Sequence, residues 1–262
     1  MTEVSAQRIK QLGDELFESL RTREPVEPLT QRAPTLTVEH AYRIQEHFIQ
    51  RRLALGGDRI VGKKIGLTSR VVQRSLGVDE PDFGQLLASM VATDSIAISN
   101  LMQPKAEGEI AFVLDRDLTG PGITNADVLR ATRAVMPCFE IVDSRVRDWR
   151  IRLLDTVADN ASAGMFVLGD RAVDPMSVDL STCGMVLEKN GSLECTGAGA
   201  AALGSPVTCV AWLANTLGKF GVPLRAGEVI LSGSLAAMIP VKAGDALHLS
   251  IGGIGSASVR FV

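Results

Sequence analysis

The stretch PKAEGEIAFVL, residues 104–114, places two carboxylates directly before an apolar run that is typical of a buried strand. Alternate side chains of a strand point to the same face, so Glu107 and Glu109 should stand side by side. Two carboxylates this close repel each other unless a cation or a shared proton lies between them, and burial strengthens the repulsion. The stretch therefore predicts a strand that carries either a cation site or a pair of exposed charges.

A third carboxylate, Glu140, lies in the equally apolar segment MPCFEIV, residues 136–142. Three carboxylates offer an all-oxygen ligand set that suits Mg²⁺ or Mn²⁺, with water or substrate oxygens completing the shell. The alternative is that Glu107 and Glu109 lie on a solvent-facing strand edge while Glu140 pairs with a nearby cation such as Arg145. Spacing alone leaves both interpretations open.

From Ile60 onward, short apolar runs alternate with clusters of Gly, Pro, Asn and Asp, a texture that indicates many strands joined by turns. We expect further buried strands at 165–168, 184–188, 229–231 and 246–251, with a hairpin turn of the Asn-Gly kind at 189–191. Two helices should interrupt them, one from Asn125, as its cap, to Met136, and one from Pro206 to Phe220.

The first quarter of the chain has a helical pattern instead. Apolar residues recur at helical spacing from about Ser5 to Arg23, and a second amphipathic helix should begin near Thr37. A Gly-Gly-Asp run at 56–58 ends this region. The sequence therefore predicts an α+β protein, with a helical N-terminal lead-in over residues 1–58 and a β-rich body over residues 59–262 that together form one functional unit.

Two lysines stand in an unusual place, the Gly-bounded apolar stretch VGKKIGLTS at residues 61–69. Lys63 and Lys64 should point to opposite faces of a strand, so that one of them faces inward. A desolvated lysine near a metal site could bind an anionic substrate or act as an acid or base. The alternative is an edge strand that its lysines protect against association.

Two more polar positions are candidates for chemistry. Asp82 falls in EPDFG, residues 80–84, whose composition is typical of a turn, so it could be a general base or simply a turn residue. Ser162 ends the polar run DTVADNAS, residues 155–162, without the G-x-S-x-G elbow of a serine nucleophile. The three histidines are scattered, which gives a His-based triad or zinc site little support.

The composition argues against several other classes of protein. A net charge of -3 with dispersed Lys and Arg, and an aromatic content of 4%, predict no nucleic-acid partner. The charged N-terminus is unlike a secretory signal, and we find no run close to the ~20 apolar residues of a membrane span. Four widely spaced cysteines without a C-x-x-C pair indicate reduced thiols and a cytoplasmic location.

Motifs along nearly the whole chain resemble the hydratase/decarboxylase family of the fumarylacetoacetate hydrolase-like superfamily, which acts in the meta-cleavage degradation of aromatic compounds. These motifs are VGKKIGLTS at 61–69, QP-x-AEGEIAF at 103–112, PCFEIVDSR at 137–145, DTVADNAS at 155–162 and GGIGS at 252–256. The resemblance implies a mixed-sheet body of that superfamily's fold. It also implies that Glu107, Glu109 and Glu140 are the ligands of a divalent metal, Mg²⁺ or Mn²⁺.

The resemblance further implies a reaction on a small 2-oxo acid or its dienol. The family's hydratases convert 2-hydroxypenta-2,4-dienoate (2-oxopent-4-enoate) to 4-hydroxy-2-oxopentanoate by way of a metal-chelated enolate, ketonisation by protonation at carbon 5, and conjugate addition of water at carbon 4. In that scheme Lys64 stabilises the enolate or relays its proton, and Asp82 orients or deprotonates the water. Ser162 then hydrogen-bonds the substrate carboxylate.

Alternatives within this superfamily share the metal site. They are 4-oxalocrotonate decarboxylase, a C–C hydrolase, and a supporting subunit of a hydratase–decarboxylase complex. The PDFG stretch at 81–84 resembles the hydratases, because the decarboxylases typically lack Asp at that position. Ala163 departs from many relatives, which carry a small polar or thiol residue there, and we expect it only to tune the shape of the pocket. We also expect a homo-oligomer.

Overall fold

The computed structural model describes residues 4–262, including every side chain in that range except those of residues 75 and 76. The N-terminal lead-in is helical, as predicted: α1 (Ala6–Thr22), α2 (Leu29–Arg32) and α3 (Val38–Leu53). Ser5 caps α1, its hydroxyl accepting from Arg8 N at 3.2 Å. Thr37 and His40 cap the start of α3 reciprocally, with two bonds of 3.3 Å. The one-turn α2 is an addition that the sequence did not predict.

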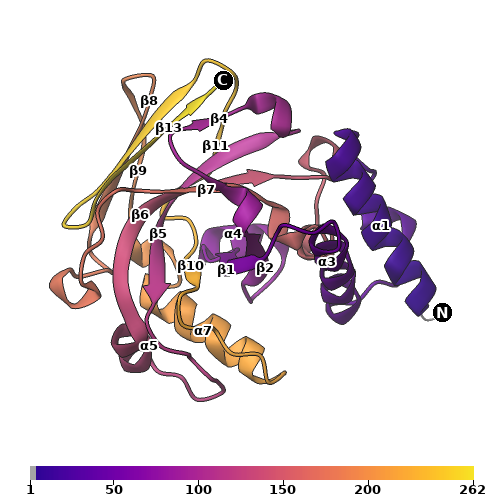
Figure 1. Ribbon diagram of the computed structural model, residues 1–262, viewed down its shortest axis with the longest axis horizontal. Helices are drawn as coiled ribbons and strands as arrows, with labels where there is room; N and C mark the ends of the chain where they lie inside the picture. Colours follow the sequence, from indigo (N-terminus) through magenta and orange to yellow (C-terminus); the bar gives the residue numbers. More distant parts are fainter. Residues whose placement is uncertain (1–3) are drawn as a thin grey trace.

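Two mixed sheets form the body (Figure 1). The larger sheet contains, in order across it, β2 (Asp82–Leu87), β1 (Ile60–Gly66), β10 (Val229–Leu231), β5 (Pro104–Leu114), β6 (Thr132–Asp143), β7 (Ala163–Leu168) and β3 (Val91–Ala92), with β11 (Ile239–Pro240) beside β5. The smaller sheet contains β4 (Ser95–Ile96), β13 (Gly255–Phe261), β12 (Ala246–Ile251), β8 (Gly184–Lys189) and β9 (Ser192–Ala198). The pairs β1–β10, β3–β7 and β4–β13 are parallel, and the other pairs are antiparallel. The predicted α+β class and mixed sheet are confirmed.

Short helices connect the strands: α4 (Arg70–Leu76), α5 (Asn125–Ala131), α6 (Leu153–Ala158) and α7 (Pro206–Gly218). Single turns of 3₁₀ helix lie at Ala88–Met90, Ile98–Asn100, Arg147–Trp149, Asn160–Ser162, Pro175–Ser177 and Gly199–Ala201. The helix predicted from Asn125 to Met136 is wrong at both ends. Thr124 is the cap, and the helix stops at Ala131 because the chain then enters β6, where eleven residue pairs join it to β5. This strand pairing overrides the local helical spacing.

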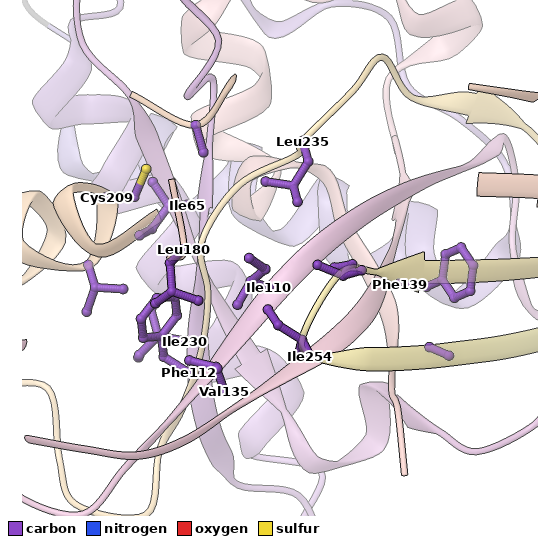
Figure 2. Close-up of a cluster of buried hydrophobic side chains, with 14 of the residues drawn as sticks. Ile65, Ile110, Phe112, Val135, Phe139, Leu180, Cys209, Ile230, Leu235 and Ile254 are labelled. Atoms are coloured by element: carbon purple, nitrogen blue, oxygen red, sulfur yellow. The ribbon is translucent and has the colours of Figure 1, made fainter. Parts of the chain in front are cut away.

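The two faces of the larger sheet bury two different apolar clusters. One cluster fills the space between the two sheets and α7, and it includes Ile110, Phe112 and Phe139 (Figure 2). The other lies between the larger sheet and the N-terminal helices, and it includes Phe48 and Ala111. Because the helices and the sheet share this second cluster, we propose that the lead-in at 1–58 and the body at 59–262 fold as one unit.

One stretch, Gly199–Gly218, differs from the expectation for membrane segments, because it is long and apolar enough by length and composition to span a membrane. In the structure it is interrupted, with a 3₁₀ turn before α7 and Pro206 at the start of that helix. The helix packs Val210, Leu213 and Leu217 into the core between the sheets. A core helix passes the same test, so the stretch is weak evidence for a membrane span.

Candidate metal centre

The three glutamates converge on one face of the larger sheet, the face that looks toward the N-terminal helices. In the β5–β6 register Glu107 lies opposite Glu140, and Glu109 lies opposite Cys138, so strand alternation turns all three carboxylates the same way. One carboxylate oxygen from each of the three lies within 4.8 Å of the others. Glu109 and Glu140 are buried, whereas Glu107 is partly exposed. The alternative of an exposed edge is therefore wrong.

Lys64 lies beside this cluster. Its Nζ is 3.1 Å from Glu140 Oε1, an ion pair rather than a well-aligned hydrogen bond, and it donates to the backbone oxygen of Ala161 at 2.9 Å. The two lysines point to opposite faces of β1 and Lys64 faces the cluster, as predicted, but Lys63 on the other face is buried as well. Lys63 lies on the opposite face of β1, as alternation requires, and pairs with Glu228 at 2.7 Å.

Asp82 is the first residue of β2 rather than part of a turn, which corrects the sequence interpretation of EPDFG. Antiparallel pairing sets Asp82 opposite Gly66 on β1, and its side chain is buried. A Cβ added to Gly66 would lie 2.2 Å from Asp82 Oδ1 and 3.2 Å from Lys64 Nζ. The missing side chain of Gly66 thus provides the space in which these two groups approach each other.

Burial and mutual repulsion shift the protonation of these groups. Burial, followed by the charge of Glu140, raises the pKa of Glu107 to about 7 and the pKa of Glu109 well above its usual value. Burial also raises the pKa of Asp82 to about 6, against the opposing charge of Lys64. Burial alone would lower the pKa of Lys64, but the surrounding carboxylates, Glu140 foremost, outweigh it and raise that pKa. Lys64 is therefore protonated in the metal-free protein.

The carboxylates of the cluster outnumber the cations beside them, and several of their oxygens lack a hydrogen-bond donor in the described part of the chain. Glu109 Oε2 accepts from Gly233 N at 2.8 Å, a contact for which the backbone adopts φ 98° at that glycine. Within residues 4–262, Glu109 Oε1 and Glu140 Oε2 have no hydrogen-bond donor, and Glu140 Oε1 has only the ion pair with Lys64. Uncompensated buried carboxylate oxygens are the donor set of a hard divalent cation. The residues present therefore fit the Mg²⁺ or Mn²⁺ site that the sequence predicts.

A cavity of about 230 Å³ opens onto this cluster. The predicted residues Lys64, Asp82, Glu107 and Ser162 all line it, so the structure brings them together. Its remaining wall includes apolar side chains and several polar ones that the sequence reasoning missed, among them Trp149, Arg152, Thr156 and Ser234. Thr156 lies in the DTVADNAS motif and could have been found there, but nothing in the local pattern around Arg152 or Trp149 indicates a cavity.

Ser162 reaches the cavity from a polar, fully buried setting. Its hydroxyl lies 3.3 Å from the Thr156 hydroxyl and 3.4 Å from Asp159 Oδ2. Asp159 in turn pairs with Arg145, which excludes Arg145 as the partner of Glu140 and corrects that alternative. Ser162 therefore offers the cavity a hydroxyl that the protein itself orients.

A carboxylate cluster that needs cations, beside a buried lysine and next to a cavity, is the arrangement of a metal-dependent enzyme. Residues 69–262 match the model of the fumarylacetoacetate (FAA) hydrolase C-terminal family. The chain belongs to the fumarylacetoacetate hydrolase family.

Two curated relatives are hydratases. The chain is 61% identical to the 2-hydroxypent-2,4-dienoate hydratase of Pseudomonas putida over 82% of this chain and 97% of that protein. It is 52% identical to the 2-hydroxyhexa-2,4-dienoate hydratase of Comamonas testosteroni over 97% of this chain and 98% of that protein.

Among solved structures, the 4-oxalocrotonate decarboxylase of Pseudomonas putida G7, complexed with magnesium and adipate, is similar over the full length of both chains, with a TM-score of 0.95 and 36% identity. The fumarylpyruvate hydrolase of Pseudomonas aeruginosa, in complex with Mn²⁺ and pyruvate, has a TM-score of 0.62 and 17% identity over 76% of this chain and 88% of that one. At that identity the likeness is one of fold.

Proposed function

We propose that this chain is a metal-dependent hydro-lyase that hydrates 2-hydroxypenta-2,4-dienoate to 4-hydroxy-2-oxopentanoate in the meta-cleavage degradation of aromatic compounds. The observation that carries the proposal is the uncompensated carboxylate cluster, which opens onto a cavity with Lys64 and Asp82 beside it. The names of the hydratases at 61% and 52% identity support the substrate class.

Glu107, Glu109 and Glu140 would hold the metal, Mg²⁺ or Mn²⁺. When bound, the cation supplies Lewis-acid stabilisation of the negative charge that develops at the carboxylate and 2-oxygen end of the substrate. The magnesium complex of the structural relative at 36% identity supports this choice of ion. The all-oxygen donor set of this chain is equally suited to both ions.

The first chemical step moves one proton. The 2-hydroxyl of the dienol loses its proton, and carbon 5 gains one, which converts the dienol into an α,β-unsaturated 2-oxo acid. Lys64 stabilises the negative charge on the 2-oxygen or relays the proton, because its ammonium group lines the cavity and the backbone oxygen of Ala161 holds it there. Ser162 donates a hydrogen bond to the substrate carboxylate.

The second step adds the elements of water, hydroxide at carbon 4 and a proton at carbon 3. Asp82 orients this water or removes its proton. A carboxyl with a pKa of about 6 can both take up and release a proton near neutral pH, which suits it to this role. The proton that Asp82 takes from water is returned at carbon 3, so that the step is balanced.

The assay follows loss of the ultraviolet band of the dienol by the purified protein, with and without EDTA, while CO₂ is measured in parallel. We expect loss of the band that depends on Mg²⁺ or Mn²⁺, without CO₂. Release of CO₂ would instead indicate a decarboxylase, the alternative that the structure at TM-score 0.95 favours. An isolated protein inactive toward the dienol and toward 4-oxalocrotonate would indicate a supporting subunit.

The role of Asp82 has its own test. Replacement by Asn should lower hydration more than it lowers solvent deuterium exchange into the ketonised substrate, and equal losses would remove the special link of Asp82 to water. We further propose a cytoplasmic homo-oligomer that associates with a 4-oxalocrotonate decarboxylase. Light scattering of the protein alone and with that enzyme would test both associations.

A further inference from the structure

Three consecutive residues beside the proposed active site adopt the left-handed backbone conformation. Asn160, Ala161 and Ser162 have φ values of 56°, 50° and 54°, and none of them is glycine. Residues with a side chain avoid this region because Cβ crowds the following carbonyl oxygen, and runs of such residues are rare. A strained turn of this kind persists only where its surroundings hold it in place.

A buried ion pair holds the turn from the side of β6. The Arg145 side chain donates to Asp159 Oδ1 at 2.5 Å, to Ala163 O at 2.9 Å and to the backbone oxygen of Asp159. Asp159 Oδ2 also accepts from Arg145 N at 3.0 Å. The guanidinium therefore bonds to the backbone on both sides of the turn, one residue before it and one residue after it.

The strand that carries Asp82 holds the turn from the other side. The Asn160 side-chain amide pairs with the backbone of Gln85, accepting from its N–H at 2.7 Å and donating to its oxygen at 2.9 Å. The turn also packs so closely on β2 that a Cβ added to Gly84 would lie 2.4 Å from the backbone oxygen of Asn160. Specific contacts therefore hold the turn on both of its sides, one from Arg145 and one from β2.

What the turn presents to the cavity is a hydrogen-bond acceptor for Lys64. Its Nζ donates to Ala161 O at 2.9 Å, and Ser162 Oγ lines the same cavity. Lys64 otherwise has Glu140 at 3.1 Å, on the side of the proposed metal ligands. The hydrogen bond to Ala161 O, together with the ion pair to Glu140, therefore sets the position of the ammonium group.

We propose that the left-handed turn Asn160–Ser162, clamped by Arg145 and Asp159, positions the Lys64 ammonium group toward the 2-oxygen of the substrate for the role assigned to it. The inference rests on the proposed function. It adds a task for the backbone of Ala161 and makes Arg145 a positioning residue. A flexible turn in the same place would leave the ammonium group free to rotate toward the carboxylates, away from the substrate oxygen.

The test is Ala161→Gly, with Arg23→Gly as the matched control. Arg23 also has a left-handed φ, 63°, but it is exposed at the end of α1. Glycine relieves the strain at both positions, so both variants should melt within about 3 °C of the wild type. For Ala161→Gly alone we expect kcat to fall roughly 10- to 100-fold, with KM and Mn²⁺ affinity within about threefold of the wild type.

Hydrogen exchange gives a readout that does not depend on turnover. The Ser162 amide donates to Asp159 O at 3.0 Å, so it should exchange slowly in the wild type and in Arg23→Gly, and faster in Ala161→Gly. A wild-type kcat in Ala161→Gly would overturn the positioning role. A loss of kcat in both glycine variants would also overturn it. The same holds if the fall of kcat in Ala161→Gly only parallels a fall in its melting temperature. A wild-type protein that does not hydrate the dienoate would contradict the proposed function instead.

Arg145→Lys provides a second variant, because it keeps the positive charge but loses the forked donor geometry. We expect a folded protein with faster exchange at Ser162 and a lowered kcat. If this variant melts much lower than the wild type, Ala161→Gly still decides the question. Slow exchange at Ser162 together with unchanged kcat in Arg145→Lys would contradict the clamp.

Discussion

Two clusters of buried charge lie on neighbouring parts of the same fold, and they are built in opposite ways. Arg145 and Asp159 form a buried ion pair, with 1% and 0% of their side chains exposed. Their polar groups find donors and acceptors in each other and in the backbone. The cluster at Glu109 and Glu140 has four carboxylates around one lysine when Glu107 and Asp82 are counted, and several of its oxygens have no donor within residues 4–262.

This difference separates a structural ion pair from a binding site. Burial of a charge destabilises a fold unless a partner and hydrogen bonds compensate it. Arg145 and Asp159 come closer to that condition, because each charge has its partner and backbone bonds within the chain, although burial still raises the pKa of Asp159 to about 6. The carboxylate cluster does not meet it, so it needs protons or a cation from outside the chain. Removing a charge should therefore have opposite effects in the two places.

The largest effect is expected from Glu109→Gln. The substitution keeps the size of the side chain but removes a charge from the proposed ligand set, so we expect kcat to fall roughly 10³-fold or more. Mn²⁺ affinity, measured by isothermal titration, should fall more than about 100-fold. Glu194→Gln is the matched control, because Glu194 is an exposed residue on β9 of the smaller sheet and is not part of the cluster, and it should change neither value. Full activity and affinity in Glu109→Gln would remove the ligand assignment.

The next effect concerns stability. Asp159→Asn leaves the guanidinium of Arg145 buried without a counter-charge, so we expect a loss of roughly 3–5 kcal/mol in the free energy of unfolding. That corresponds to a fall of about 10 °C in the melting temperature of the metal-free protein. Glu109→Gln should instead raise this temperature, because it relieves repulsion. If both variants shift the melting temperature in the same direction, the contrast between the two clusters is wrong.

A smaller effect is expected from pH. Since the native pKa of Glu107 is raised to about 7 and that of Glu109 is raised further, the native metal-free protein binds protons that the unfolded chain has released. Its stability should therefore decrease as the pH rises from the ordinary glutamate range through 7. Between pH 6.5 and 8.5 we expect a loss on the order of 1–2 kcal/mol, seen as a falling melting temperature. Saturating Mg²⁺ should largely remove this dependence, and a metal-free protein that gains stability over the same range would contradict it.

The smallest effect is expected at the buried pair on the other face of β1. Replacing Lys63 by Met together with Glu228 by Gln removes both charges while keeping an acceptor for Arg225 N, which Glu228 now binds at 2.9 Å. We expect less than about 1.5 kcal/mol of lost stability and kcat within about twofold of the wild type. A large loss of kcat would mean that the two faces of β1 are coupled.

Strand alternation predicted that Glu107 and Glu109 share a face, but it left a cation site and an exposed pair open, and the family resemblance favoured the metal site. Glu140 joins them because it lies opposite Glu107 in the β5–β6 register. The N-terminal helices were predictable for a similar reason, since caps such as Ser5 and Thr37 act locally. The family resemblance, rather than spacing, indicated that Asp82 and Ser162 belong to the same site.

Other features depend on contacts that the sequence does not display. Lys63 and Lys64 are both buried only because partners distant in the chain, Glu228 and Glu140, meet them there. The segment 132–136 became a strand because β5 pairs with it. The left-handed turn at 160–162 contains no glycine that would predict it, and the contacts that hold it come from Arg145, just after β6, and from Gln85 on β2.

The central claim is that the carboxylate cluster of Glu107, Glu109 and Glu140 is a cation site, and the thermal unfolding of EDTA-treated protein at increasing Mn²⁺ tests it most directly. The account predicts a progressive rise of the melting temperature, worth about 2.7 kcal/mol at a Mn²⁺ concentration 100 times the dissociation constant. It also predicts that Glu109→Gln loses most of this rise, while Glu194→Gln keeps it. No rise in the wild type, or an equal rise in Glu109→Gln, would contradict the claim.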